Sequence, residues 1–196
     1  MTPTRSFWFY NSSAWVQIES AGNAWLLTGN AGINPATHFI GTTDDQPLRF
    51  KINNLNIGLL NKYGNVFWGP GSGNANTTAF SNVAVGNAPL HTNTNRSNLV
   101  AIGDSALFNN GTGATVSIEA SYNTAVSSKS LFANTTGYSN TAVGTSALDS
   151  NKTGVQNTAV GTAALFNNIN GTNNTAMAAY ALYKNTSGNK NTAIGE

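Results

Sequence analysis

From residue 65 onward the sequence repeats with a strict period of seventeen positions. The common pattern of the copies is Asn, Thr, Ala, a β-branched residue and Gly, followed by two or three small residues and a Leu. The aligned alanines of the copies are Ala84, Ala101, Ala125, Ala142, Ala159, Ala176 and Ala193. The step from Ala101 to Ala125 is longer than the others, so this copy carries an insertion. A repeat of this regularity predicts a stack of similar structural units.

The length and composition of the unit select the kind of stack. Helical repeats need about 33 residues or more, and Thr-Ala-Val-Gly runs flanked by Asn and Gly favour strands and turns. We therefore predict an all-β fold, a parallel β-solenoid with one 17-residue coil per repeat over residues 65–196. Successive coils are expected one strand spacing apart, about 4.8 Å.

Stacking places equivalent residues of successive coils above one another. We predict a ladder of side-chain amides from Asn140, Asn157, Asn174 and Asn191. We predict that the β-branched position, with Val143 and Val160 and then Met177 and Ile194, fills a common interior. The remaining interior residues are expected to be Leu148, Leu165 and Leu182.

The amount of apolar side chain bears on assembly. Each coil offers one β-branched residue, one Leu and a few Ala, which is little for a self-sufficient core. Small side chains such as Ala let backbones approach closely, so three parallel rods burying their Ala faces would supply the missing contact. We predict a homotrimer. The alternative is a monomeric solenoid whose alanines fill tight corners.

Residues 1–64 differ from the repeats. Residues 1–32 are predicted to form a small aromatic-rich β-hairpin module, because residues 10–15 separate two apolar runs. Its aromatic residues suit a mini-core or a trimer plug, with sugar or partner binding as the alternative. Residues 33–64 are predicted to be a β connector, with a second hairpin over residues 39–60 that turns at residues 44–47. Residues 65–196 form the third segment, the β-roll.

These residues resemble a known family. The Asn-Thr-Ala-Val-Gly units are similar to the left-handed parallel β-roll repeats in the heads of trimeric autotransporter adhesins. They also resemble repeats in fibre proteins of Bacteroidetes and their phages, which often precede an endosialidase-type chaperone domain. Residues 25–32, 34–48 and 50–54 resemble the connector found before such rolls. The resemblance implies a left-handed, trimeric roll, and because the chain stops inside a repeat we expect a fragment of a longer fibre.

Composition argues against several other functions. Only 8% of the residues are charged, against about 25% in ordinary domains, and the nine cations form no run that would neutralise phosphates. No membrane span or signal peptide is visible. The two histidines, His38 and His91, are isolated, and of the seven carboxylates only Asp44 and Asp45 are adjacent, in a predicted turn. We expect no enzyme, no metal site and no cofactor.

Surface recognition remains, with two candidate loops. The insertion between Leu107 and Asn123 interrupts a regular rod, and insertions in repeat proteins often bind ligands. Its candidate receptor contacts are Asn110, Thr112, Thr115 and Glu119. A second turn carries His91 and Arg96. The alternatives are a tolerated bulge and a solvated turn.

A third candidate is the residue after Leu, which is aromatic in four copies: Phe108, Phe132, Phe166 and Tyr183. Such a row stacks on sugar faces or, alternatively, packs against the next coil. Asp149 interrupts the row.

The expected function is that of a non-enzymatic trimeric segment of a phage tail fibre or phage-tail-like particle. It would build a stiff shaft or head and present receptor-binding surfaces, on a virion tail or at the cell surface. Expected partners are further copies of the chain, adjoining fibre or baseplate proteins and a host glycan or protein, with no nucleic acid and no membrane insertion. Alternatives are a bacterial cell-surface adhesin head, an ice-binding solenoid using the row of threonines, and a carbohydrate-cleaving fibre.

Overall fold

The computed structural model describes residues 7–18, 31–34, 36 and 39–195. The chain forms two compact units, Met1–Thr43 and Asp44–Glu196, and the described residues are all-β with no helix. In the first unit β1 (Phe7–Tyr10) and β2 (Trp15–Ile18) pair antiparallel. The Asn11 side chain closes their turn by accepting from the Ala14 N–H at 2.9 Å. Trp25 and its neighbours lie outside the described residues.

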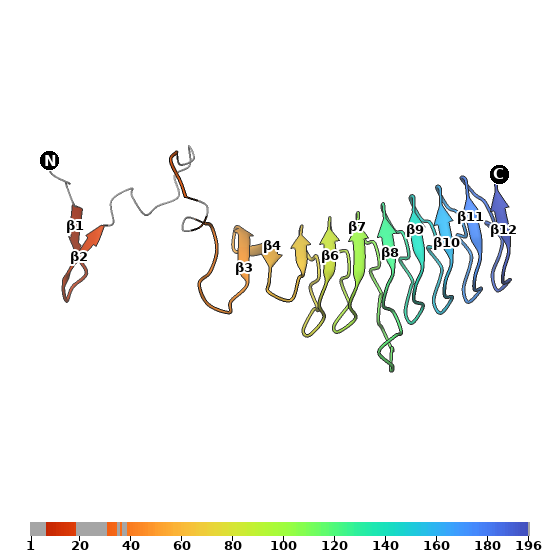
Figure 1. Ribbon diagram of the computed structural model, residues 1–196, viewed down its shortest axis with the longest axis horizontal. Helices are drawn as coiled ribbons and strands as arrows, with labels where there is room; N and C mark the ends of the chain where they lie inside the picture. Colours follow the sequence, from red (N-terminus) through yellow and green to blue (C-terminus); the bar gives the residue numbers. More distant parts are fainter. Residues whose placement is uncertain (1–6, 19–30, 35, 37–38, 196) are drawn as a thin grey trace. The chain divides into compact units, whose positions relative to one another are not determined.

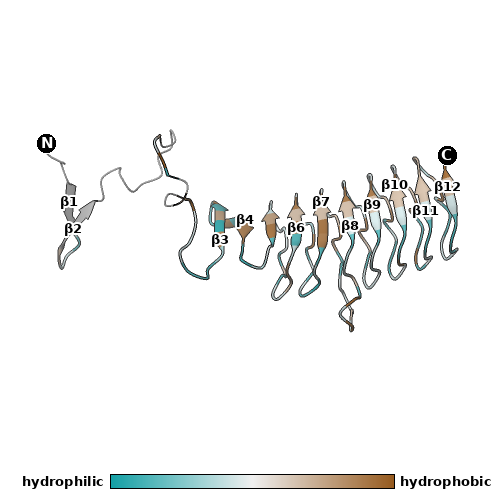
Figure 2. Cartoon of the chain, viewed as in Figure 1, coloured by the Kyte–Doolittle hydropathy of each residue, from teal (hydrophilic) through white to brown (hydrophobic). Residues whose placement is uncertain are grey.

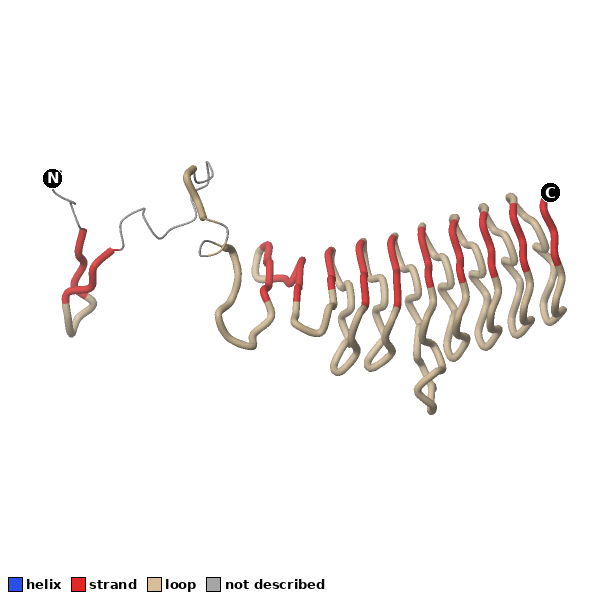
Figure 3. Tube along the Cα trace, in the orientation of Figure 1, coloured by secondary structure: helices blue, strands red, loops and turns tan. Residues whose placement is uncertain are grey.

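The second unit is a parallel β-solenoid of about eight coils, as the 17-residue period predicted (Figures 1 and 3). Each coil contributes one short strand to a single sheet, and the repeats pair in register, with Ala159 between Ala142 and Ala176. The coil strands are β5 (Val66–Trp68), β6 (Asn82–Val85), β7 (Leu99–Ile102), β8 (Thr124–Val126), β9 (Thr141–Val143), β10 (Thr158–Val160), β11 (Thr175–Met177) and β12 (Thr192–Ile194).

A hairpin precedes the first coil and continues its sheet. β3 (Leu48–Ile52) pairs antiparallel with β4 (Leu55–Leu60), which pairs antiparallel with β5. The predicted turn at residues 44–47 is wrong, because the chain reverses at Asn53 and Asn54, which have φ values of 45° and 64°. Two successive left-handed residues make the turn that matches strand twist, and Asn tolerates that conformation better than most residues.

The interior holds alanines and leucines. Strand residues alternate between faces, so Asn and Ala point inward and Thr and Val point outward. The prediction that Val143 and Val160 fill the interior is therefore wrong: Val143 is 37% exposed, and Val160 is only half-buried. The equivalent alanines are fully buried against the predicted leucines, Leu148 and Leu165 among them, with Leu182 partly buried. They are thus used inside one chain and do not form a face for other chains.

The leucines sit at a left-handed corner of each coil. Leu148 and Leu165 each have a φ of 52°, and the equivalent leucines of other coils have nearly the same value. This backbone costs a non-glycine residue about 1–2 kcal/mol, which the burial of a leucine side chain, about 1.5–3 kcal/mol, offsets. The corner is what folds the chain back toward the sheet within a single coil.

The asparagine ladder runs inside the coils as a chain of paired amides. The Asn157 Nδ2 donates to Asn140 Oδ1 at 3.1 Å and to the Gly171 carbonyl at 2.8 Å. Its Oδ1 accepts from the N–H and the Nδ2 of Asn174 at 3.0 and 3.1 Å. Both donors and both acceptor positions of a buried amide are therefore used. Asn140 and Asn191 belong to the same ladder.

A second asparagine ladder, which sequence reasoning missed, lies beside the first. It consists of Asn93, Asn110, Asn134, Asn151, Asn168 and Asn185. In most coils both ladders donate to one carbonyl: Gly154 O accepts from Asn140 at 2.8 Å and from Asn151 at 3.1 Å. A Cβ on Gly154 would lie 2.3 Å from the Asn151 Oδ1, so a side chain at this position would require the Asn151 amide to shift.

Candidate functional site

The insertion forms an ordered loop between β7 and β8 that extends beyond the turns of neighbouring coils (Figure 1). Thr112 and Thr115 are exposed on it, and Glu119 is half-buried. The Glu119 carboxylate accepts from the N–H groups of Thr115 and Val116 at 2.6 and 3.1 Å. These bonds, with a smaller contribution from the charge of Arg96, lower the pKa of Glu119. The carboxylate therefore fixes the loop conformation.

Arg96 anchors the same loop from the preceding coil. Its guanidinium donates to the carbonyls of Ala114 and Val116 at 2.8 Å each, and its own carbonyl accepts from both asparagine ladders at 2.9 Å. The residue is only 7% exposed. The prediction of Arg96 as a receptor contact is therefore wrong, because its side chain is used in holding the loop.

Two other predicted contacts are buried or partly buried. Asn110 is fully buried in the second ladder, where it donates to Ala120 O at 2.9 Å. The His91 ring stacks on Phe108 with centroids 4.7 Å apart, and its Nδ1 is buried without a partner among the described residues. Of the predicted contacts, Thr112 and Thr115 are the fully exposed ones.

A groove of about 410 Å³ lies beside the loop. Phe80 and Tyr122 line it and are about half exposed, at 52% and 53%, together with Ile118 of the loop. Ser97 contributes a hydroxyl that accepts from the Phe80 N–H at 3.0 Å. Sequence reasoning missed both aromatic residues because they occupy different positions of the repeat and so leave no periodic signal.

The aromatic row packs coil on coil. Phe108 and Phe132 stack with centroids 5.5 Å apart, as do Phe166 and Tyr183 at 5.3 Å. Asp149 occupies the position of the row that lacks an aromatic residue, and it is half-buried there. Desolvation raises the pKa of its carboxyl, against the opposing effects of the Ser146 hydrogen bond and the charge of Lys129.

The outer face of the sheet carries an apolar column, one residue per coil. Figure 2 shows that hydrophobic residues recur in the strand of successive coils. All its members are exposed or half-buried, and they are Trp68, Val85, Ile102, Val126, Val143, Val160, Met177 and Ile194. A column of threonines lies beside it on the same face in the later coils, from Thr124 to Thr192. Contiguous exposed apolar surface of this kind marks an interaction site.

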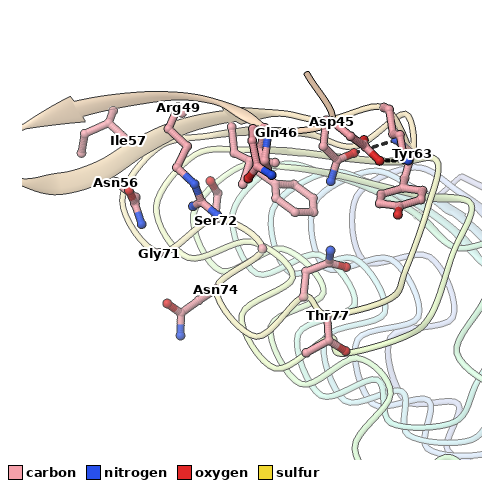
Figure 4. Close-up of a pocket in the computed structure, with 18 residues that line it drawn as sticks. Asp45, Gln46, Arg49, Asn56, Ile57, Tyr63, Gly71, Ser72, Asn74 and Thr77 are labelled. Atoms are coloured by element: carbon pink, nitrogen blue, oxygen red, sulfur yellow. Dashed lines mark hydrogen bonds and ion pairs between the residues drawn. The ribbon is translucent and has the colours of Figure 1, made fainter. Parts of the chain in front are cut away.

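A cavity of about 360 Å³ lies at the start of the solenoid, between the β3–β4 hairpin and the turn at residues 71–77 of the first coil (Figure 4). Arg49, Asn74 and Asn76 are among its lining residues. At its rim, Lys62 pairs with Asp45, whose hydrogen bond raises the pKa of the lysine.

Comparisons with protein-family models, curated proteins and solved structures find no match for the chain. Within the described part of the chain, no three His, Asp or Glu side chains gather where they could hold a metal. The same residues include no helix able to span a membrane. The geometry thus offers two hollows, a projecting loop and an apolar column as surfaces for binding.

Proposed function

We propose that this chain is a segment of a homotrimeric, non-enzymatic fibre of a phage tail or phage-tail-like particle. It builds a stiff shaft or head from a left-handed roll and presents receptor-binding surfaces for host attachment. The apolar column on the outer sheet face carries the proposal, because it replaces the buried alanines as the surface through which copies associate. The N-terminal hairpin is proposed as a small module at the end of this segment.

The column runs through every coil, so it follows the direction in which coils stack. Copies related by rotation about an axis parallel to the rod bring the same coil of each chain to the same level. Residues of different size along the column, such as Trp68 and Met177, then meet their own equivalents. Three copies around such an axis follow from the resemblance to trimeric rolls.

The projecting loop is the proposed receptor-binding element. Its backbone is held by Arg96 and Glu119, so Thr112 and Thr115 are presented without a large entropy loss on binding. The partners are then two further copies, adjoining fibre or baseplate proteins and a host glycan or protein. The same surfaces serve a bacterial cell-surface adhesin head, which is the alternative.

Ice binding is a lower-ranked candidate. The outward column from Thr124 to Thr192 favours it, but the neighbouring column is aliphatic, so there is one hydroxyl row and not two. Thermal hysteresis of the purified protein measures this activity directly.

Sedimentation equilibrium tests the assembly. We expect a mass three times that of the 20.4 kDa chain. Met177→Asp, made with Val143→Asp, places carboxylates in the column and should lower the mass toward one chain. Ile169→Asp is the matched control, because Ile169 and Met177 are both 44% exposed and only Met177 lies in the column. A monomeric wild-type protein, or a double variant with unchanged mass, contradicts the proposal.

A further inference from the structure

The end cavity differs from the rest of the solenoid in its hydrogen bonding. In the turn that contains the left-handed leucine and the residues just after it, N–H groups of one coil donate to carbonyls of the next coil. Leu90 N donates to Ala106 O and Thr92 N to Phe108 O, both at 3.1 Å. The accepting carbonyls of this turn therefore face the preceding coil. The first coil is preceded by the hairpin instead of a coil, so its carbonyls face the cavity.

Several acceptors in the cavity wall consequently lack donors. The carbonyls of Ser72, Asn74 and Thr77 are equivalent to those that accept in later coils, yet they receive no hydrogen bond from any described residue. The Asn76 side chain adds a fourth acceptor, because its Oδ1 is buried with no partner in the described structure. Of these four acceptors the Asn76 Oδ1 is the buried one, and a buried acceptor without a partner is unfavourable unless a ligand or water supplies the donor. Asn74 and Thr77 are exposed and Ser72 is half-buried, so their carbonyls are open to a ligand that enters the cavity.

The donors of the cavity lie together at Arg49. Figure 4 shows its side chain directed toward Ser72 and the backbone at Gly71. The guanidinium makes no ion pair or hydrogen bond with the described residues. The Gly71 N–H is also without an acceptor among them, whereas the equivalent N–H of Ala88 donates to Pro70 O at 2.8 Å. Arginine with an adjacent N–H group is a carboxylate-binding arrangement.

The two groups of atoms define one ligand chemistry. A ligand that satisfies the cavity needs an anionic group for Arg49 and several hydroxyl donors for the carbonyls and Asn76. Phosphate lacks enough donors, and a neutral sugar forms no ion pair with the guanidinium, which is exposed to solvent when the cavity is empty. The cavity volume of about 360 Å³ is at the small end of the range for ligand sites, about 300–1,000 Å³. The exposed ring of Tyr63 lies at the rim of the cavity.

We propose that the end cavity binds a carboxylated sugar, with the carboxylate on Arg49 and Gly71 N–H and the hydroxyl groups on the wall formed by residues 72–77. The site deepens the receptor-binding part of the proposed function and rests on it for its biological role.

The test measures binding of D-glucuronate, D-glucose and acetate to the full chain by calorimetry. We expect glucuronate to bind at least tenfold more tightly than either partial ligand. Arg49→Gln should weaken glucuronate binding about 10- to 100-fold, the range for hydrogen bonds to a charged group. Lys51→Gln is the control, because it removes the same charge from the same strand outside the cavity lining, and affinity should stay within about twofold.

The site is refuted if glucuronate shows no saturable binding up to about 10 mM, if acetate binds as well, or if both charge variants bind equally. A glucuronate-terminated disaccharide separates the two sources of the sugar: tighter binding identifies a glycan end, weaker binding a free sugar, and either result supports the site. Sedimentation of the same samples keeps the two proposals apart. A monomer that binds glucuronate overturns the trimer and supports the cavity.

Discussion

Replacing Asn157 by alanine tests whether the first ladder stabilises the solenoid. The side chain makes four hydrogen bonds inside a fully buried site. At about 0.5–1.5 kcal/mol each, they contribute about 2–6 kcal/mol. Two of the partner groups keep a second bond, since Asn140 Oδ1 still accepts from the backbone N–H of residue 157 and Gly171 O from Asn168. The N–H of Asn174 is left without an acceptor.

We therefore expect Asn157→Ala to lower the free energy of unfolding by about 3–4 kcal/mol, or the melting temperature by about 10 °C. Chemical denaturation followed by circular dichroism measures it. Asn170→Ala is the control, because Asn170 is exposed and its loss should change stability by less than about 0.5 kcal/mol. Asn157→Leu should destabilise less than Ala, since a leucine, Leu99, fills the equivalent site of another coil. A change below about 1 kcal/mol for Asn157→Ala would refute the ladder argument.

Two further predictions concern charged groups. Arg96→Lys loses the two carbonyl contacts of the guanidinium, so amide hydrogen exchange at residues 114–119 should accelerate at least about tenfold; unchanged exchange would contradict the anchoring role. Asp149→Phe completes the aromatic row and should raise stability by about 1 kcal/mol. Burial raises the folded-state pKa of Asp149 above its ordinary 3.8, so the stability of the wild-type protein should rise as pH falls through that raised pKa. Asp149→Asn should remove this part of the pH dependence. An identical pH profile of stability for the two proteins would count against this prediction.

The sequence predicted the coils and their register, because a strict 17-residue step leaves in-register stacking as the way to superpose equivalent residues. It did not predict which strand face is buried. In the run Asn157-Thr158-Ala159-Val160, each face receives one polar and one apolar residue, so hydrophobic alternation gives no answer. Hydrogen bonding determines which face is buried, because a buried asparagine satisfies its amide within the ladder. The alanine on the same face leaves room for the leucine side chain.

The candidate site was less predictable for a related reason. Arg96 looks like a solvated turn residue because its acceptors are backbone carbonyls of residues 114 and 116, which no side-chain pattern records. Asn110 did carry a signal, since asparagines recur at its position with the repeat period. The unpaired carbonyls of the end cavity follow only from knowing that a hairpin precedes the first coil.

The asparagine bonds run in one direction along the solenoid, which suits assembly from the N-terminus. The ladder asparagines donate back to the coil before them, as the N–H and Nδ2 of Asn174 do to Asn157, so the ladder of a finished coil presents acceptors to the residues that follow it. The hairpin supplies the first template, since β4 pairs with β5 and Ile57 O accepts from Gly69 N. Growth from the N-terminus matches the order of synthesis. At about 5–20 residues per second, the ribosome delivers one coil's worth of chain about every one to three seconds, and each arrives at a surface already shaped to receive it.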